Sequence, residues 1–489
     1  MINLSFLIRN CFTKITQLIP ANSFSMRKLI LLCVSLCFLG GALNSVGAAK
    51  DSRLKVSSNG RYLVYSDGRP FFYLGDTAWE LFHRLNRGEA DLYLENRARK
   101  GFTVIQAVVL AELDGLKTPN AYGALPFVNM DTSKPNEAYF KHVDYIVKKA
   151  GSLGLYIGML PSWGDKVGMH GNYFINEQNA PAYGRFLGRR YADQPIIWIL
   201  GGDRPSEVTA PIWTALAHGL KAGDRGRHLM TFHPSGGGHS AVMFHYSDWL
   251  DFNMIQSGHT PTSVNYSHIL SDYNLQPAKP CMDGEPAYEY PPDDMPATRP
   301  NGALQVRLRA YWALFAGAHG HTYGTHSIWQ MYAPPRQPLW DVHQPWQETM
   351  DLPGVDQLGY LKALLFSRPF LSRIPDQTSI YSGLQSKLAY VQVTRDGSVG
   401  RNDATYLLAY FPHYSRITLK TERILGKTLR GWWFNPRDGS VRPLGEFEKP
   451  SRMEFAPPTN SEAEDWVLVL DDAAKNYPQP GTPIKQKTG

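Results

Sequence analysis

The feature that most constrains the fold is a regular alternation of short apolar runs and amphipathic stretches between about residues 70 and 330. Several runs are apolar almost throughout, which is typical of strands buried on both faces. Strands that alternate with helices indicate parallel βαβ units, and eight in succession favour a closed (β/α)8 barrel. The predicted strands are Phe71–Gly75, Phe102–Val109, Leu155–Leu160, Ile196–Leu200, His228–Phe232, Phe252–Gln256, Lys279–Met282 and Gly320–Thr325.

An open doubly wound sheet is the alternative architecture for such an alternation. That fold usually carries a glycine-rich phosphate loop after its first strand. Here the first run leads into Gly75-Asp76-Thr77-Ala78-Trp79, which is no such loop. The sequence therefore predicts an α/β chain built on a TIM barrel.

The amphipathic stretches predict the helices. Asn136 is expected to cap one helix, because its side chain can accept a hydrogen bond from a free backbone amide of the first turn. An apolar stripe over Val208–Leu220 predicts a second helix, with Gly223 as its stop signal. A third helix is expected over Gln305–Phe315.

The pattern changes near residue 376, where residues alternate as in half-buried strands. Short strands separated by turn signals predict a small all-β sandwich over residues 376–474. Its expected strands include Leu388–Val393, Thr405–Tyr410, Arg416–Leu419 and Trp466–Leu470. The Pro- and Lys-rich residues 475–489 are expected to be disordered.

The barrel domain is assigned to residues 50–375. It begins with a predicted hairpin, whose strands Leu54–Val56 and Tyr62–Tyr65 flank a turn at Ser58-Asn59-Gly60.

Residues 1–49 are interpreted as an upstream extension and a signal peptide. Met26-Arg27-Lys28 precedes an apolar run from Leu29 to Leu39, and small residues follow as far as Ala48-Ala49. The run is too short to span a membrane comfortably. The sequence therefore predicts export to the periplasm or the extracellular space, with no stable membrane insertion after cleavage.

The formal net charge of +7 depends on this segment, which holds four basic and no acidic residues. Without it the net charge is about +3, and no Lys/Arg-rich run stands out, so a nucleic-acid partner is not supported. The predicted mature chain keeps a single cysteine, Cys281, so it has no internal disulfide.

The active site of a (β/α)8 barrel lies at the carboxyl ends of the strands. The side chains expected there can stack on sugar rings, hydrogen-bond hydroxyl groups or pair with an acidic sugar such as a uronate. The candidate substrate-binding residues are Asp76, Trp79, Gln106, Glu112, Trp163, Lys166, Arg204, His233, Gln256, Tyr288 and His321. Trp79 and Trp163 are expected to stack on sugar faces, and Lys166 and Arg204 can pair with a uronate.

Two carboxylates are the sharpest feature of this rim. Asp203 follows the fourth predicted strand and Glu285 follows the seventh, so the two groups lie on opposite sides of the barrel mouth. Glycoside hydrolysis needs such a pair, one to protonate the leaving oxygen and one to attack the anomeric carbon or direct a water to it. A helix N-cap or a rim salt bridge is the alternative role for either acid alone.

No metal or cofactor is expected. His319, His321 and His326 lie near the eighth strand, whereas metal-dependent barrel hydrolases tend to place a His-x-His pair on the first. We interpret these three histidines as hydrogen-bonded rim residues.

Four segments resemble the apiosidase-like family of glycoside hydrolases, glycoside hydrolase family 140. They are Phe72–Trp79, Gly101–Gln106, Trp198–Asp203 and Gly284-Glu285-Pro286 with Tyr288-Glu289. The resemblance covers roughly residues 52–370. The downstream module, with Gly431–Gly439 and Asp465–Leu468, looks like the β-sandwich that commonly follows that domain and whose family label is a collagen-binding domain; the label alone does not indicate collagen binding here.

The resemblance implies a retaining mechanism, with Asp203 in the position of the family's acid/base and Glu285 in that of its nucleophile. Most barrels of the broader clan use Asn-Glu on strand four, whereas this sequence has Gly202-Asp203, as the apiosidase-like family does. The family's characterised activity implies cleavage at apiose in rhamnogalacturonan II. A plant cell-wall oligosaccharide or polysaccharide is thus the expected partner.

Two other functions remain open at this point. The same barrel can carry a different glycosidase, such as an endo-β-glycanase, or it can serve as a non-catalytic carbohydrate-binding scaffold. An extended aromatic cleft favours the endo-glycanase, and a closed pocket favours cleavage at a single site.

Overall fold

The computed structural model describes residues 53–168, 173–298, 300–340, 342–461 and 463–488. The predicted signal segment at 1–49 lies outside these residues. Within the described ranges, no helix combines the length and the apolar character that a membrane crossing requires.

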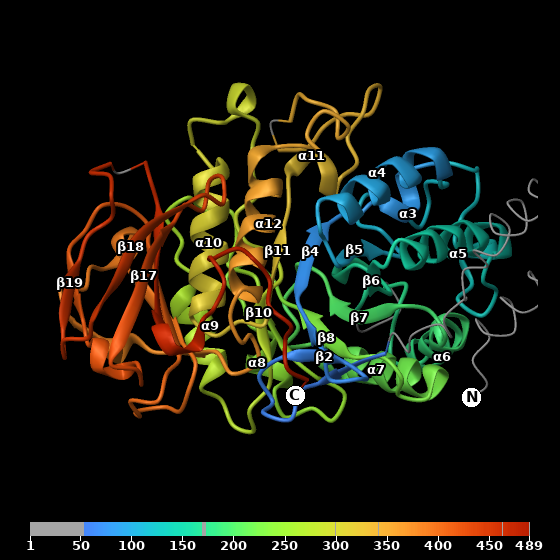
Figure 1. The fold of residues 1–489 in the computed structure, drawn as a ribbon. Coiled ribbons are helices and arrows are strands. Elements are labelled where there is room, and N and C mark those ends of the chain that lie inside the picture. The colour runs from blue at the N-terminus through green and yellow to red at the C-terminus, as the bar shows by residue number, and fades with distance from the viewer. Residues whose placement is uncertain (1–52, 169–172, 299, 341, 462, 489) are drawn as a thin grey trace, which may run out of the picture. The chain divides into compact units, whose positions relative to one another are not determined.

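Eight parallel strands form the central sheet, in the order β8-β7-β6-β5-β4-β11-β10-β9. Each predicted strand overlaps one of them, which confirms the TIM-barrel prediction (Figure 1). The strands are β4 (Tyr73–Thr77), β5 (Val104–Val108), β6 (Tyr156–Leu160), β7 (Ile196–Gly201), β8 (Met230–His233), β9 (Asn253–Ile255), β10 (Cys281–Asp283) and β11 (Gly320–Tyr323).

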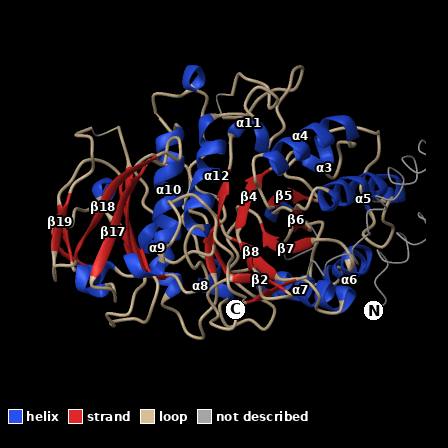
Figure 2. Cartoon of the chain, viewed as in Figure 1, coloured by secondary structure: helices blue, strands red, loops and turns tan. Residues whose placement is uncertain are grey.

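Helices follow the strands and surround the sheet (Figure 2). They are α3 (Leu81–Arg84), α4 (Arg87–Arg99), α5 (Glu137–Ser152), α6 (Ala180–Tyr191), α7 (Ala210–Asp224), α8 (Ser240–Phe244), α9 (Tyr266–Tyr273), α10 (Ala303–Phe315), α11 (His326–Trp329) and α12 (Pro353–Phe366). Asn136 caps α5 as predicted, because its side chain accepts a hydrogen bond from the Ala138 amide.

The second predicted helix is α7, which begins two residues after Val208 and ends one residue after Gly223. Val208 lies before α7 and is exposed, and Gly223 lies inside the helix. A side chain at Gly223 would meet the backbone of Arg185 and Arg189 in α6. That glycine therefore permits close packing of two helices, and Arg225, in the left-handed region, ends α7 instead.

The ring of strands is closed between β8 and β9 by a few contacts rather than by a regular ladder. The Asp251 amide donates to the Met230 carbonyl at 2.8 Å, and the Thr231 hydroxyl donates to the Phe252 carbonyl at 2.7 Å. Beyond the strand ends, the Gly237 amide donates to the Gln256 carbonyl at 2.8 Å. These contacts, which we call the β8–β9 seam, fix the positions of the residues at the carboxyl ends of β8 and β9.

A small antiparallel sheet precedes the barrel. It contains β1 (Leu54–Val56), β2 (Leu63–Tyr65) and β3 (Pro70–Phe71), so the predicted hairpin is present with one further strand. Leu63 and Phe71 join the apolar cluster of the barrel interior, and Phe71 packs on Tyr156 at the amino-terminal end of β6. The hairpin sheet therefore closes the end of the barrel opposite the rim.

The C-terminal region is a sandwich of two antiparallel sheets around its own apolar core, as predicted. The larger sheet contains β12 (Ile374–Pro375), β14 (Gln392–Arg395), β15 (Tyr406–Phe411), β20 (Trp466–Asp472), β17 (Thr428–Phe434) and β18 (Val441–Glu448). The smaller sheet contains β13 (Ile380–Ser382), β16 (Ile417–Leu419) and β19 (Met453–Phe455). Strand β14 begins four residues later than predicted, because Lys387–Ala389 forms a short helical turn.

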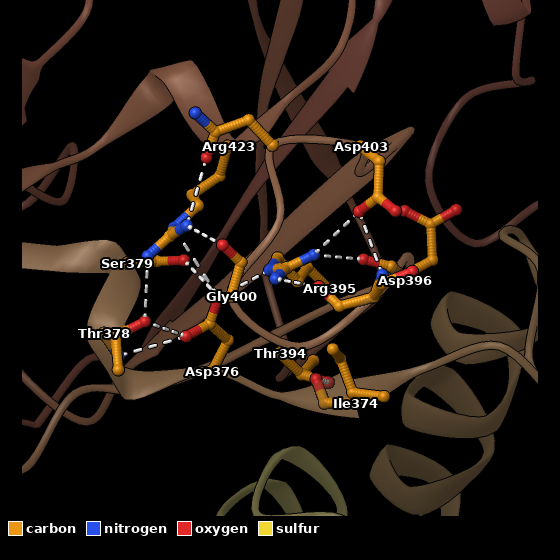
Figure 3. Close-up of polar contacts among 12 residues, drawn as sticks. Ile374, Asp376, Thr378, Ser379, Thr394, Arg395, Asp396, Gly400, Asp403 and Arg423 are labelled. Carbon is orange, nitrogen blue, oxygen red and sulfur yellow. Dashed lines mark hydrogen bonds and ion pairs between the residues drawn. The ribbon is translucent and has the colours of Figure 1, made fainter.

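Buried arginine pairs organise the start of the sandwich (Figure 3). The Arg395 guanidinium is fully buried and donates to the Asp376 carboxylate, directly after β12. Arg423 approaches the same carboxylate at 3.9 Å and donates to the Thr378 hydroxyl. Strand β12 itself pairs with β14, so the sandwich sheet begins two residues before the predicted boundary.

The C-terminal segment differs from the disordered tail predicted at 475–489. The Ile484 amide donates to the Phe366 carbonyl, and the Gln486 side chain bonds backbone groups of Phe366, Arg368 and Phe370. A Pro- and Lys-rich composition lowers the tendency to form helices and strands, yet backbone and amide groups still bind a neighbouring surface. The prediction of disorder is therefore wrong for the described residues up to 488.

Barrel and sandwich meet along α10. Arg307 of α10 donates two hydrogen bonds to the Asp465 carboxylate, each of 2.9 Å, and both side chains are buried. Beside this pair, Tyr311 stacks on Tyr410 with ring centroids 4.6 Å apart. A buried ion pair and an aromatic stack thus join the sandwich to the barrel.

We expect Arg307→Ala to lower the free energy of unfolding by about 3–5 kcal/mol, because it leaves the Asp465 carboxylate buried without its main partner. Arg416→Ala is the matched control, since Arg416 pairs with Glu454 on the surface and the expected loss is about 0–1 kcal/mol. Urea unfolding of both variants measures the difference. Equal losses in the two variants would contradict a stabilising role for the interface pair.

Candidate active site

A cavity of about 560 Å³ lies at the carboxyl ends of the barrel strands. Loops that follow all eight strands contribute to its walls. The lining residues are Trp79, Glu112, Trp163, Asp203, Gly236, Gly237, Gln256, Ser257, Gly258, His259, Thr260, Glu285, Tyr288, His326, Trp329, Leu339 and Trp340.

The backbone after β7 places Asp203 on this cavity. Gly201, Gly202 and Asp203 all have positive φ, at 91°, 124° and 53°. A side chain at Gly201 would meet the His233 carbonyl at 2.2 Å, and one at Gly202 would meet the Trp163 ring at 2.7 Å. Only glycines fit this turn, so the Gly-Gly pair is the local reason that Asp203 can leave the strand and face the cavity.

Glu285 lies across the cavity, two residues after β10. His233 Nε2 is 3.0 Å from its Oε2 atom, and His259 Nε2 is 3.1 Å from its Oε1 atom. Each carboxylate oxygen therefore faces one imidazole. The backbone beside it is held as well, because the Gln106 side-chain amide donates to the Gly284 carbonyl at 3.1 Å.

The environment shifts the pKa values of Glu285 and Asp203 in opposite directions. Burial by itself favours a neutral Glu285, but the contacts with His233 and His259 hold its pKa well below the usual range. Burial raises the pKa of Asp203, and the nearby charge of Glu285 raises it further. The pKa of His233 is raised by Glu285 despite the burial of the ring. The surroundings thus stabilise the ionised form of Glu285 and raise the pKa of Asp203.

Glu112 adds a third carboxyl group to the cavity wall. Burial raises its pKa to about 7, against the opposing effect of Arg204. The Arg204 guanidinium lies 3.6 Å from Glu112 and 4.0 Å from the Asp203 carboxylate. Arg204 does not line the cavity itself, but it links two carboxyl groups that do.

The predicted stacking residues Trp79 and Trp163 line the cavity but are only 2% exposed. Their rings pack on each other at 5.2 Å, and both contact the His233 ring. Both tryptophans therefore form part of the cavity wall, and neither exposes a ring face on which a sugar could stack. Gln256 contacts Asp203, and Tyr288 lies buried beside Glu285 with a raised pKa from burial, so both are in the predicted region.

Two further predicted residues lie in the barrel wall. Asp76 is fully buried and accepts hydrogen bonds of 2.5 Å each from Tyr93 and Arg97 of α4. It therefore holds a helix against the sheet instead of reaching the cavity. Gln106 lies beneath the cavity, where it supports the Gly284 carbonyl. Neither position supports the prediction of direct substrate contact.

Lys166 and His321 are also away from the cavity. Lys166 pairs with Asp165 at 2.8 Å and lines a separate hollow on the same side of the barrel. His321 is fully buried in β11, where burial lowers its pKa to about 3. A position at the end of a strand does not determine whether a side chain faces the barrel mouth, the barrel wall or a neighbouring loop. For this reason Asp76, Gln106, Lys166 and His321 were wrongly expected to contact the substrate.

Several cavity residues were not among the predicted site residues. His259 belongs to the long loop after β9, and its contact with Glu285 depends on the folded path of that loop. His326, Trp329, Leu339 and Trp340 come from α11 and the loop that follows it. His326 was expected at the rim but not as a substrate-binding residue, and the sequence signal for the other three is an aromatic-rich segment after the eighth strand.

His319, His321 and His326 do not form a metal cluster. In the described residues, no three His, Cys, Asp or Glu side chains are grouped in a way that could hold a metal ion. Burial lowers the pKa of His319 to about 3, so this ring is neutral inside the barrel. His326 instead lies in the cavity wall, against Tyr288 and Tyr290.

Two family models match the chain. The model described as "Apiosidase-like, catalytic domain" matches residues 57–372, and the model described as "Putative collagen-binding domain of a collagenase" matches residues 374–471. A search of curated proteins found no match.

Two solved glycoside hydrolase structures are similar to nearly the whole chain. A structure named "Glycoside hydrolase" is 36% identical, with a TM-score of 0.80, and the match covers 88% of this chain and 98% of that one. A glycoside hydrolase family 5 structure from Bacteroides vulgatus ATCC 8482 is 33% identical, with a TM-score of 0.81 and coverage of 90% and 97%. The catalytic model spans most of the chain and both structures match nearly all of it, so the chain belongs to the apiosidase-like family of glycoside hydrolases.

Proposed function

We propose that this chain is an exported, retaining glycosidase that cleaves at apiose in the pectin component rhamnogalacturonan II. The single observation that carries the catalytic part is the pair of acids on one cavity, Asp203 and Glu285, whose pKa values are displaced in opposite directions. Environments that separate two carboxyl groups in this way assign one as acid and the other as base or nucleophile. Membership of the apiosidase-like family supports the choice of sugar.

In the first step, the Glu285 carboxylate attacks the anomeric carbon while the bond from that carbon to the leaving oxygen breaks. Asp203 gives its proton to the leaving oxygen, so the departing group leaves as an alcohol. In the second step, a water attacks the anomeric carbon and Asp203 takes its proton, which releases Glu285 as a carboxylate. His233 and His259 stabilise the charged form of Glu285 before and after the two steps.

One cation beside the cavity, Arg204, supports an acidic polymer as substrate. Arg204 is half-exposed beside Asp203, so it can meet a galacturonate next to the cleaved sugar. Lys166, the other predicted partner for a uronate, is held by Asp165 in the separate hollow and is left out of this proposal.

We expect Glu285→Gln and Asp203→Asn each to lower kcat by about a hundredfold or more, because each removes one of the two carboxyl functions. Asp165→Asn is the matched control, since it makes the same chemical change on a neighbouring loop outside the cavity. Circular dichroism and thermal unfolding of all three proteins check that the fold is kept. Near-normal turnover in either cavity variant would contradict the assignment.

The pH dependence of kcat/KM should follow the two displaced pKa values. Asp203 must be protonated, so activity falls as pH rises through its raised pKa, above the usual aspartate range. Glu285 must be ionised, so activity falls only below the usual glutamate range. His259→Gln removes one contact that favours the charged form, so we expect its acid limb to move to higher pH.

Glu112 is the competing source of the alkaline limb, because its pKa is also raised. Profiles of wild type, His259→Gln and Glu112→Gln from pH 3 to 9 separate the two assignments. An alkaline limb that disappears in Glu112→Gln would transfer the acid role away from Asp203.

A product assay tests substrate and stereochemistry together. Rhamnogalacturonan II fragments are compared with arabino-, galacto- and gluco-oligosaccharides, and proton NMR identifies the anomer that is released first. We expect cleavage at apiose with retained configuration. Preference for a gluco- or galacto-oligosaccharide would favour the endo-β-glycanase, inverted product would exclude Glu285 as nucleophile, and no cleavage of any substrate would favour a binding protein.

A further inference from the structure

Trp340 differs from the other tryptophans of the cavity because its side chain is open to solvent. It is 53% exposed, whereas Trp79 and Trp163 are 2% exposed. Leu339 beside it is also an exposed apolar residue on the cavity wall. The open aromatic surface of this site therefore lies on the loop after α11 rather than on the tryptophans that follow β4 and β6.

The backbone holds Trp340 in place. The fully buried Gln330 side chain accepts a hydrogen bond from the Leu339 amide at 2.9 Å and donates one to the Leu339 carbonyl at 3.0 Å. The Gln330 side-chain NH2 group also donates to the His326 carbonyl at 2.9 Å, which ties the loop to α11. Trp340 itself has a φ of 66°, a left-handed conformation that is costly for a bulky residue. Such strain persists where the surroundings fix it, and it gathers at ligand sites.

A row of rings joins Trp340 to the proposed nucleophile. His259, which contacts Glu285, lies 5.3 Å from the His326 ring, and His326 lies 6.2 Å from the Trp340 ring at an angle of 31°. Two ring-to-ring steps therefore separate Trp340 from the ring at the carboxylate. A sugar stacked on Trp340 would therefore be a different residue from the one whose anomeric carbon faces Glu285.

We propose that Trp340 is the platform of a second sugar subsite, which stacks on the apolar face of a neighbouring residue of the glycan. The inference rests on the proposed glycosidase function and extends it from one bound sugar to at least two. A flat, amphipathic ring fixed in advance binds a sugar face with little loss of side-chain freedom. The buried Gln330 acts here as a positioning residue, because it fixes the backbone and does not reach the ligand.

The test uses the inactive Glu285→Gln protein, so that binding is measured without turnover. Calorimetry compares the best-cleaved oligosaccharide of the panel with methyl apioside, each on the Glu285→Gln background with and without a second change. We expect Trp340→Ala to weaken oligosaccharide binding at least tenfold and methyl apioside binding by much less. Trp340→Phe keeps a flat ring and should restore most of the affinity.

Tyr246→Ala is the control, since it removes an exposed aromatic side chain outside the cavity. Equal affinity in Trp340→Ala and its parent would overturn the subsite while leaving the proposed function in place. Equal weakening of oligosaccharide and methyl apioside would also overturn it, because the ring would then belong to the cleaved sugar. If no glycan of the panel is cleaved or bound by any of these proteins, the proposed function and the subsite both fail.

Discussion

Closure of the strand ring is the constraint on which the site depends. The carboxyl ends of eight parallel strands form one closed rim only if β8 and β9 lie side by side. Few contacts join these two strands. The seam includes the Thr231 hydroxyl and the loop amide of Gly237. His233 ends β8 and Gln256 follows β9, so one contact of each acid comes from a residue at this seam.

The two acids owe their different character to what surrounds them. Glu285 is buried between two imidazoles, which favour its charge more than burial opposes it. Asp203 leaves β7 through a turn that only glycines can make, and burial with a negative neighbour favours its neutral form. The opposite pKa shifts of the two carboxyl groups thus follow from local electrostatics, with no need for different chemical groups.

The sandwich is coupled to this arrangement through α10. That helix lies in the chain between β10, which Glu285 follows, and β11, which leads to the Trp340 loop. On its outer side α10 makes the buried contact of Arg307 with Asp465 and the stack of Tyr311 on Tyr410. The second domain therefore braces the part of the barrel that forms one wall of the cavity.

Apolar periodicity alone determined the barrel, its eight strands and the sandwich, because burial on both faces leaves a continuous hydrophobic run and burial on one face leaves alternation. The same periodicity predicted that Asp203 and Glu285 are rim residues, because a residue that directly follows a barrel strand lies at the rim. Only tertiary packing decided the direction in which each rim side chain points. Asp76 pairs with Arg97, Lys166 pairs with Asp165, and His321 is buried inside the barrel. Likewise, the contact of His259 with Glu285 and the place of Trp340 on the cavity depend on the folded paths of long loops, whose conformations depend on contacts distant in sequence.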